Sequence, residues 1–339
     1  MTTLGIKLSP QNCTIADLRA VWRIADEAGF DHLWAFDHLN PIFADVTGDI
    51  FEGMTLLAAM AEATSRVRIG LMVTANTYRH PGLLAKMATT IDHLSGGRLE
   101  FGIGASGAEA EHTMLGIPFF TPGERIRRLG EALTVCRRLW TEARVSFDGR
   151  YYTLTDAVAN PKPLQRPHPP IWVGGAGERL TLRVVAEHAD VWNVIGPVED
   201  VVHKSSVLDR HCADIGRDPA EIKRSVQPRF DHTDPAAMID LLQAYVEAGF
   251  TENVVYIPPG DEPVRAAEIA AEHVLPEITG RRGQDAPVQP RAAPYSRSTS
   301  APCSPSIGAA RGNAVAERPN RKGTATPLAG PDAGSRYDS

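Results

Sequence analysis

Residues 67–105 read VRIGLMVTANTYRHPGLLAKMATTIDHLSGGRLEFGIGA, and this stretch contains one complete strand–helix–strand unit. A β-rich run over 67–74 is followed by a helical run over about 82–94, a Ser-Gly-Gly turn, and a second β-rich run over 98–105. Strands joined through a helix pair in parallel, because the helix carries the chain back across the sheet. The stretch therefore predicts one β/α unit of a parallel sheet.

The same alternation continues on both sides of this unit. Candidate strands are residues 4–9, 31–37, 67–74, 98–105, 171–175, 190–195, 222–229 and 253–258. Candidate helices are residues 14–28, 50–63, 82–94, 122–141, a run that ends near 188, 199–215, 235–248 and 262–274. Eight strand–helix pairs in about 275 residues predict an α/β fold of the (β/α)8 TIM-barrel type. A doubly wound open sheet is the alternative.

One segment interrupts the alternation after the fourth helix. Residues 144–154 read RVSFDGRYYTL, in which Asp148-Gly149 is flanked by aromatic residues. An Asp-Gly pair between two β-rich runs is a strong signal for the tight turn of a β-hairpin. We therefore expect the barrel to carry an insertion after helix 4.

The composition changes near residue 280. The chain has 339 residues and a formal net charge of −6, but residues 280–339 contain nine Lys or Arg against four Asp or Glu. The same segment contains eight prolines and few large apolar side chains. Such a segment buries too little apolar surface to offset the entropy lost on ordering. The sequence therefore predicts a barrel domain over residues 1–279 and a disordered Pro/Arg/Ser-rich C-terminal tail over residues 280–339.

Other patterns exclude whole classes of protein. No run of about 18 apolar residues is present, and the N-terminus lacks the basic and apolar segments of a signal peptide. The four cysteines are scattered and the histidines show no metal-binding spacing, so we expect neither disulfides nor a metal site. These observations favour a cytoplasmic protein that acts on a small molecule, with no membrane and no nucleic-acid partner.

In a barrel of this kind the functional residues lie where the strands end. The second candidate strand ends in Asp37-His38. A histidine in an apolar barrel mouth can exchange protons near neutral pH, so His38 is a candidate acid or base. A buried histidine bonded to the backbone is the alternative. Trp34, Phe36 and Phe43 are the expected apolar walls of a substrate pocket.

Two glycine-rich segments also follow strands. Residues 104–107 and 174–177 each lie between a candidate strand and a segment that can be helical. Glycine in such a place lets backbone N–H groups turn toward one anion, although sharp strand-to-helix turns need glycine in any case. Two such loops on neighbouring strands predict a cradle for the phosphate of a cofactor.

Several stretches together resemble the luciferase-like monooxygenase superfamily, and most closely its actinobacterial F420-dependent oxidoreductases. They are AGFDHLWAFDH, the unit quoted above, GERIRRLGEALTVCRRLWTE, VSFDGRYYTL and NPKPLQRPHPPIWVGGAGERLTLRVVAEHADVWN. The resemblance covers roughly residues 4–276. It implies a barrel with an insertion, usually a homodimer, that binds a flavin or deazaflavin at its C-terminal mouth.

The resemblance also implies roles for individual residues. His38 would face the reactive carbon of the cofactor ring with Asp37 beside it, and Asn76 would lie near the ring edge. A bulge with a non-proline cis peptide would lie under the ring, within Leu71, Met72 and Val73. The remaining cofactor-binding residues that it implies are Gly104, Ala105, Ser106, Gly174, Gly175, Ala176, Gly177 and Trp192, with Asn193 lining the same mouth.

One segment departs from the pattern of the superfamily. Relatives read Gly-Ala-Gly-Trp-x-Glu-x-Glu after the fourth strand, whereas residues 104–111 of this chain read GASGAEAE. Ser106 and Gly107 therefore replace a glycine and a tryptophan, and an aromatic wall is lost while both acidic residues stay. Glu109 is a further candidate acid or base, with a solvated carboxylate at a helix start as the alternative.

Three functions are compatible with these features. The first is an F420-dependent oxidoreductase that transfers a hydride to or from a small organic substrate, with His38 as the acid or base. The second is an FMN-dependent monooxygenase that receives reduced flavin from a partner reductase. The third is a protein that binds the cofactor with little turnover. Arg79 and Arg229 lie near strand ends and are candidates for binding a charged substrate, although surface or ion-paired roles are favoured for both.

Overall fold

The computed structural model describes residues 2–42, 44–260 and 262–280. This part of the chain contains the alternation of strands and helices that the sequence predicts. The expected disordered tail lies outside the described residues except for Gly280, so the boundary near residue 279 stays a prediction.

Eight parallel strands close into a barrel in the described part of the chain. They are β1 (Thr3–Leu8), β2 (His32–Ala35), β3 (Arg68–Leu71), β5 (Leu99–Gly104), β8 (Ile171–Gly174), β9 (Val191–Val194), β10 (Lys223–Val226) and β11 (Glu252–Ile257). The pairings of β1 with β11 and of β3 with β5 complete the circle. The expected TIM barrel is confirmed, since the alternative open sheet would leave two edges unpaired.

The strand expected over residues 67–74 is interrupted at its C-terminal end. β3 ends at Leu71, and the two-residue β4 (Thr74–Ala75) resumes pairing with β5. Between them the Met72–Val73 peptide bond is cis, which confirms the expected non-proline cis peptide. Met72 and Val73 both line the cavity described below.

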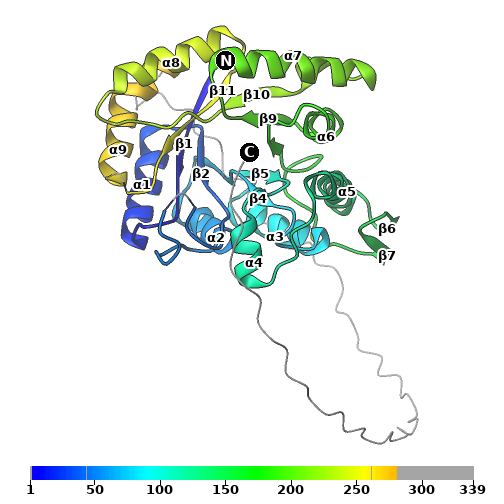
Figure 1. Ribbon diagram of the computed structural model, residues 1–339. Coiled ribbons are helices and arrows are strands. Elements are labelled where there is room, and N and C mark those ends of the chain that lie inside the picture. The colour runs from blue at the N-terminus through cyan, green and yellow to red at the C-terminus, as the bar shows by residue number, and fades with distance from the viewer. Residues whose placement is uncertain (1, 43, 261, 281–339) are drawn as a thin grey trace, which may run out of the picture. The chain divides into compact units, whose positions relative to one another are not determined.

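Helices cover the outside of the barrel. They are α1 (Ile15–Ala28), α2 (Gly53–Ala63), α3 (Pro81–Leu94), α4 (Glu109–Leu115), α5 (Pro122–Thr141), α6 (Thr181–His188), α7 (Val198–Asp214), α8 (Pro235–Glu247), α9 (Pro263–Ile269) and α10 (Leu275–Thr279), with a 3-10 turn at Pro219–Glu221 and a π-helical turn at Ala270–Val274. Figure 1 shows α1, α8 and α9 on one side of the strands and α5 and α6 on the other. Among the described helices, none is long and apolar enough to cross a membrane.

Local sequence explains where α1 begins and ends. Thr14 and Asp17 each accept a hydrogen bond from the other's backbone N–H in a capping box. This arrangement satisfies two donors that the first helical turn leaves unpaired. The helix stops at Gly29, whose φ of 102° is a conformation that glycine adopts at little cost.

The fourth helix that the sequence predicts is α5, and the insertion that follows it is the expected hairpin. β6 (Val145–Asp148) and β7 (Thr153–Ala157) pair antiparallel. Glu131 of α5 accepts hydrogen bonds from the backbone N–H groups of residues 150–152, which holds the turn against the helix. The hairpin is therefore fixed to the outer helical layer and adds no residue to the cavity at the barrel mouth.

Aromatic side chains fill the centre of the barrel. The rings of Trp34 on β2 and Trp172 on β8 meet edge to face with centroids 4.7 Å apart, and both residues are 1% exposed. Met72, Val191 and Val254 pack with them in one cluster. Trp34 thus belongs to the core and does not line the cavity, which corrects its expected place in a substrate pocket. A large inward-facing residue of a barrel strand is buried by the strands opposite.

Candidate active site

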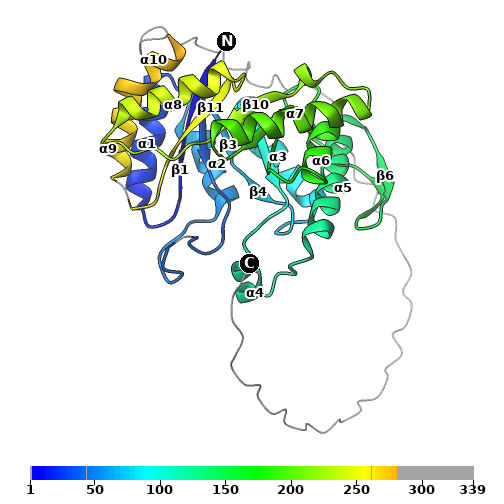
Figure 2. The same ribbon diagram turned by 45° about the horizontal axis from the view of Figure 1, so that its top comes forward.

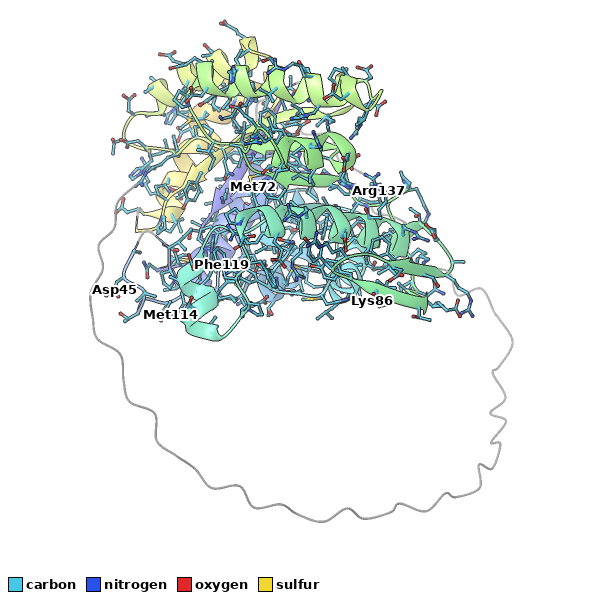
Figure 3. All side chains as sticks on the ribbon, turned by 45° about the vertical axis from the view of Figure 1, so that its right-hand side comes forward. Asp45, Met72, Lys86, Met114, Phe119 and Arg137 are labelled. Atoms are coloured by element: carbon cyan, nitrogen blue, oxygen red, sulfur yellow. The ribbon has the colours of Figure 1, made fainter. Side chains whose placement is uncertain are left out.

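A cavity of about 470 Å³ opens where the barrel strands end. Its lining comes from the C-terminal ends of β1, β5, β8 and β11, from the segments that follow β2, β3, β9 and β10, and from the start of α5. Figure 2 shows α4 and the blue segment between β2 and α2 projecting on the same side of the barrel. Figure 3 places Met72 in the interior, and Asp45 and Met114 at the periphery. This end of a (β/α)8 barrel is where active sites form.

His38 lines this cavity and is held by a carboxylate. Its Nδ1 lies 2.9 Å from Oε1 of Glu111 on α4. Burial would raise the pKa of Glu111, but hydrogen bonds from the His38 ring, the Tyr78 hydroxyl and a backbone N–H outweigh it and hold this pKa below its usual value. An ionised carboxylate only accepts hydrogen bonds, so Nδ1 of His38 carries a proton. The second ring nitrogen, Nε2, is then the one that can exchange a proton with a ligand.

Glu111 also ties α4 to the barrel. Its Oε2 accepts the backbone N–H of Leu39 at 2.7 Å, and its Oε1 accepts the hydroxyl of Tyr78. The next residue on α4, His112, places Nε2 2.8 Å from the hydroxyl of Thr77. These contacts fix the short helix to the segments after β2 and β4, and they hold the His38 ring in one orientation.

Both carboxylate oxygens of Asp37 are engaged. Oδ2 accepts hydrogen bonds from Nη1 of Arg79 and from the hydroxyl of Thr74, each at 2.5 Å, and Oδ1 accepts Nη2 of Arg79 at 3.1 Å. The Arg79 guanidinium also contacts Glu52 at the start of α2. Asp37 is 1% exposed, so this cluster clamps the ends of β2 and β4 together. Asp37 is therefore suited to holding the strand ends in place, and His38 is the residue that can exchange a proton.

The opposite wall of the cavity depends on glycine. A Cβ atom at Gly102 would overlap the carbonyl oxygen of Leu71, and one at Gly104 would lie 2.7 Å from Cγ2 of Val73. At Gly174 on β8 a Cβ atom would lie 3.1 Å from Cγ1 of the same valine. These glycines on β5 and β8 therefore make room for the segment between β3 and β4. Glycine is therefore needed at these positions for steric reasons, whether or not the loops bind a phosphate.

The segment that follows β5 leaves space for a ligand. Within the described residues no atom lies within 4 Å of a Cβ atom built on Gly107, and Ser106 has a φ of 65°. Arg125 of α5 lines the same cavity, is 8% exposed, and stacks its guanidinium over the ring of Phe119 at 3.9 Å. Its buried Nε has no hydrogen-bond partner in the described part of the chain. Nη1 of the same guanidinium donates to the backbone carbonyl of Phe120. An open backbone segment and a cavity-lining guanidinium that is not fully hydrogen-bonded together suit an anionic group.

The family model for luciferase-like monooxygenases matches residues 1–290 of the chain. The chain belongs to the luciferase-like monooxygenase family. An F420-dependent glucose-6-phosphate dehydrogenase from Microbacterium testaceum is 35% identical over 333 residues, which cover 82% of this chain and 97% of that relative. An enzyme of the same name from Beutenbergia cavernae is 27% identical over 340 residues, which cover 84% of this chain and 99% of the relative.

Solved structures agree with this family assignment at the level of the fold. An F420-dependent secondary alcohol dehydrogenase in complex with an F420–acetone adduct has a TM-score of 0.74 and 19% identity, and the match covers 82% of this chain and 99% of that one. The coenzyme F420-dependent tetrahydromethanopterin reductase from Methanopyrus kandleri has a TM-score of 0.69 and 19% identity, with the same coverage of both chains. At this identity the likeness concerns the barrel itself.

Most residues that resemblance to the luciferase-like family singles out lie at the cavity. Those that line it are Asp37, His38, Met72, Val73, Gly104, Ala105, Ser106, Gly174 and Gly175, while Ala176 and Asn193 line an adjoining recess. Among the expected pocket residues, Phe36 lines the cavity and Phe43 lies outside the described residues.

Other expected cofactor-binding residues lie behind the wall. Trp192 is fully buried and donates Nε1–H to the carbonyl of Gly175 at 2.8 Å. Asn76 is 3% exposed and donates Nδ2–H to the backbone carbonyl of Arg125 at 3.3 Å. Leu71 packs in the main core, and Gly177, like these three, is absent from the lining among the described residues. Trp192 and Asn76 thus support the wall of the site from outside it.

Glu109 lies outside the cavity as well. It is exposed at the start of α4, whereas Glu111 is 2% exposed and meets His38. Successive helical residues are about 100° apart, so side chains two positions apart face different directions. Of the two acidic residues that the family pattern keeps, the second is the one at the site. Arg79 is ion-paired, as favoured, and Arg229 is exposed.

Several cavity residues escaped the sequence analysis: Lys7, Tyr78, Arg125 and Tyr256. Each lies in or beside an element whose pattern was explained by packing alone. Lys7 carried a signal, because a charged residue interrupts the otherwise apolar run LGIKL of β1. In a barrel whose interior is packed, such a residue close to a strand's C-terminal end is a candidate for the site.

Proposed function

We propose that this chain is an F420-dependent oxidoreductase that transfers a hydride between the deazaflavin and a small organic substrate, with His38 as the acid or base. The observation that carries the proposal is the His38–Glu111 pair, which leaves one ring nitrogen for a ligand in the cavity at the barrel mouth. Relatives named as F420-dependent enzymes support the choice of cofactor.

The residues present fit a phosphate-bearing deazaflavin. Met72, Val73 and the glycine edges of β5 and β8 would hold the ring, because they form a wall without charged side chains. Gly107 and Arg125 would hold the phosphate, since one leaves the backbone open and the other has an unsatisfied N–H. When bound, F420 supplies the carbon that accepts or releases hydride.

His38 would handle the proton that accompanies the hydride. In the oxidation of an alcohol, Nε2 takes the hydroxyl proton while the hydride leaves the carbon and the C–O bond becomes a carbonyl. In the reverse direction Nε2 returns this proton to the carbonyl oxygen. Glu111 accepts the hydrogen bond from Nδ1–H throughout, so it keeps the ring in one tautomer and one orientation.

Fluorescence titration tests the choice of cofactor. We expect the purified chain to bind F420 at least about a hundredfold more tightly than FMN, because the proposed phosphate-binding residues, Gly107 and Arg125, would be matched to F420. The reverse order would contradict the proposal and favour the FMN-dependent monooxygenase. Binding of F420 without oxidation of F420H2 by any of a panel of ketones, enones, imines and quinones would instead favour a cofactor-binding protein.

A homodimer, a partner reductase that supplies reduced cofactor, and a cytoplasmic location stay predictions from the resemblance and the sequence. Light scattering of the purified chain tests the first of them. Turnover with F420 reduced chemically, in the absence of any second protein, tests whether a reductase partner is needed in the assay.

A further inference from the structure

Lys7 is a buried amine at the cavity that the proposed proton transfer does not use. It lies one residue before the end of β1, is 7% exposed, and lines the cavity. Its Nζ donates a hydrogen bond to Oε1 of Gln227 at 2.7 Å. It also lies 4.8 Å from the ring centroid of Tyr256 and 5.6 Å from that of Phe36. The amine is therefore held between two aromatic rings and one amide.

The partner amide is itself fixed by a polar chain across the barrel. Nε2 of Gln227 donates to Oδ1 of Asn193 at 2.5 Å, and Nδ2 of Asn193 donates to the hydroxyl of Ser225 at 2.9 Å. These bonds determine which end of the Gln227 amide faces Lys7, because the amide nitrogen is already used. Strands β1, β9 and β10 thus cooperate to place one amine at a defined point of the cavity.

Lys7 has no carboxylate within ion-pair distance among the described residues. In the part of the chain that the structure describes, no acidic oxygen forms an ion pair with Nζ, whereas Lys204 and Lys223 each pair with a glutamate. Burial accordingly lowers the pKa of Lys7 to about 7. An ammonium has three N–H donors, and among the described residues Gln227 is the hydrogen-bond partner of one of them. A buried cation without a counter-ion is costly unless a ligand supplies the missing charge.

We propose that Lys7 binds an anionic group, a carboxylate or a phosphate, of the organic substrate. This inference rests on the proposed function and names the substrate class of the same cavity. Lys7 and Arg125 both line the cavity, and neither forms an ion pair with a carboxylate within the part of the chain that the structure describes, but they come from β1 and α5 respectively. Arg125 accompanies the open segment at Gly107 and is assigned to the cofactor. Lys7 is the cation left for the substrate.

The surroundings make binding at Lys7 depend on pH. The titratable groups that line the same cavity are His38 and Asp37 after β2, Tyr78 after β4, Tyr256 on β11 and Arg125 on α5. Asp37 is ion-paired with Arg79, which it shares with Glu52. Burial raises the pKa of both tyrosines, so neither tyrosine ionises near pH 7. The lysine is charged below its pKa of about 7 and neutral above it. An anion therefore binds more tightly below pH 7 than above it.

Paired probes test this inference on the full chain loaded with F420. Benzoate is compared with benzyl alcohol, and glucose 6-phosphate with glucose, by isothermal titration. We expect at least one anion to bind tenfold or more tightly than its neutral partner at pH 6. In Lys7→Met this preference falls at least tenfold, while neutral probes change less than threefold. Lys204→Met, a lysine on α7 that pairs with Glu178, is the matched control and leaves the preference unchanged.

The pH arm uses the carboxylate pair, because benzoate keeps its charge between pH 6 and pH 8.5. Its affinity falls at least fivefold over this range in the natural chain, and Lys7→Met abolishes the fall. Lys7→Arg keeps a charge at both pH values and restores binding at pH 8.5. Anion affinity that is equal in the natural chain and in Lys7→Met overturns the inference, and so does a panel in which no anion is preferred.

A readout that needs no cofactor separates this inference from the proposed function. Reductive methylation of the chain without F420, followed by mass spectrometry, reports how reactive the Lys7 amine is. We expect the preferred anion to slow methylation of Lys7 at least fivefold and to leave Lys204 unaffected. Protection of Lys7 in a chain that fails to bind F420 would sink the proposed function alone. Binding of F420 with no protection by any anion would sink this inference alone.

Discussion

The two walls of the cavity are built by different means. The wall at the C-terminal ends of β1, β2 and β10 carries side chains that can donate or hold protons, namely Lys7, His38 and Gln227. The wall that follows β5 and β8 is a backbone surface in which glycines admit the segment between β3 and β4. The first wall contributes polar and titratable side chains, and the second contributes an uncharged backbone surface.

This difference indicates how the barrel divides its tasks. Charged and polar side chains need fixed partners when buried, and Glu111, Arg79 and Asn193 provide such partners through the hydrogen bonds described above. A flat ligand needs an uncharged surface that a side chain would obstruct. The division predicts that changes on the first wall alter turnover, whereas changes on the second alter stability or cofactor binding.

The largest effect is expected on the first wall, at His38. His38→Ala should lower kcat by about 10²- to 10⁴-fold, the range typical of a lost acid or base. F420 affinity should stay within about tenfold, because the ring and phosphate contacts lie on other elements. Steady-state kinetics and fluorescence titration measure the two quantities. His203→Ala, on α7 and away from the cavity lining, is the control, and unchanged turnover in His38→Ala would remove His38 from its role.

A pair of glycine substitutions sharpens the description of the second wall. Gly102→Ala should destabilise the fold by about 2 kcal/mol, since its Cβ would overlap the carbonyl oxygen of Leu71 and the core has no space to yield. Gly107→Ala should change stability by less than about 0.5 kcal/mol, because its Cβ meets no described atom within 4 Å. Thermal or urea unfolding compares them. Equal losses in both variants would contradict the steric explanation.

Glu111→Gln removes the negative charge from the His38–Glu111 pair and keeps a side chain of the same size. We expect kcat to fall about tenfold, because the bond from His38 becomes a neutral one and roughly halves in strength. The folded-state pKa of Glu111 is lowered, so the ionised carboxylate stabilises the fold above its unfolded pKa and this contribution is lost as pH falls through the folded value. The stability difference between the two chains should therefore shrink below about pH 4. Unfolding curves at several pH values test this, and a constant difference would argue against it.

The smallest effect is expected for Arg125→Met on the cofactor side. F420 affinity should fall about tenfold at low salt and less at high salt, because the lost contact is electrostatic and screened. Arg128→Met, three residues further along α5 and paired with Glu124, serves as the control. A loss that is equal for both variants, or that does not depend on salt, would place the phosphate elsewhere.

Much of the fold was predictable from the sequence because it depends on local patterns. The strand–helix alternation, the capping box at Thr14 and the Asp-Gly hairpin all correspond to observed elements. The position of His38 at the cavity follows from its place just after a barrel strand. The cis peptide at Met72–Val73 came from the resemblance to a family, since no spacing or composition predicts it.

The residues that surround His38 were harder to predict. Glu109 and Glu111 are equally plausible in the sequence, and only the rotation of α4 decides which one reaches the histidine. Trp34 on β2 and Phe36 just after β2 are two residues apart, the spacing of one strand face, yet Trp34 packs in the barrel core and Phe36 lines the cavity. A short strand near the mouth has residues at different depths, and depth is set by the stagger of the closed barrel.

By itself the sequence determined the barrel, its insertion and the ends of the strands where chemistry occurs, because periodicity and turn residues act over a few neighbouring positions. The tertiary structure alone decided that Glu111 reaches His38, that Arg79 pairs with Asp37, and that Lys7 lies at the cavity with no carboxylate partner among the described residues. These pairs join residues from different strands and helices. Their distances, burial and charge exist only once the barrel closes, since closure brings distant segments together and removes water from between them.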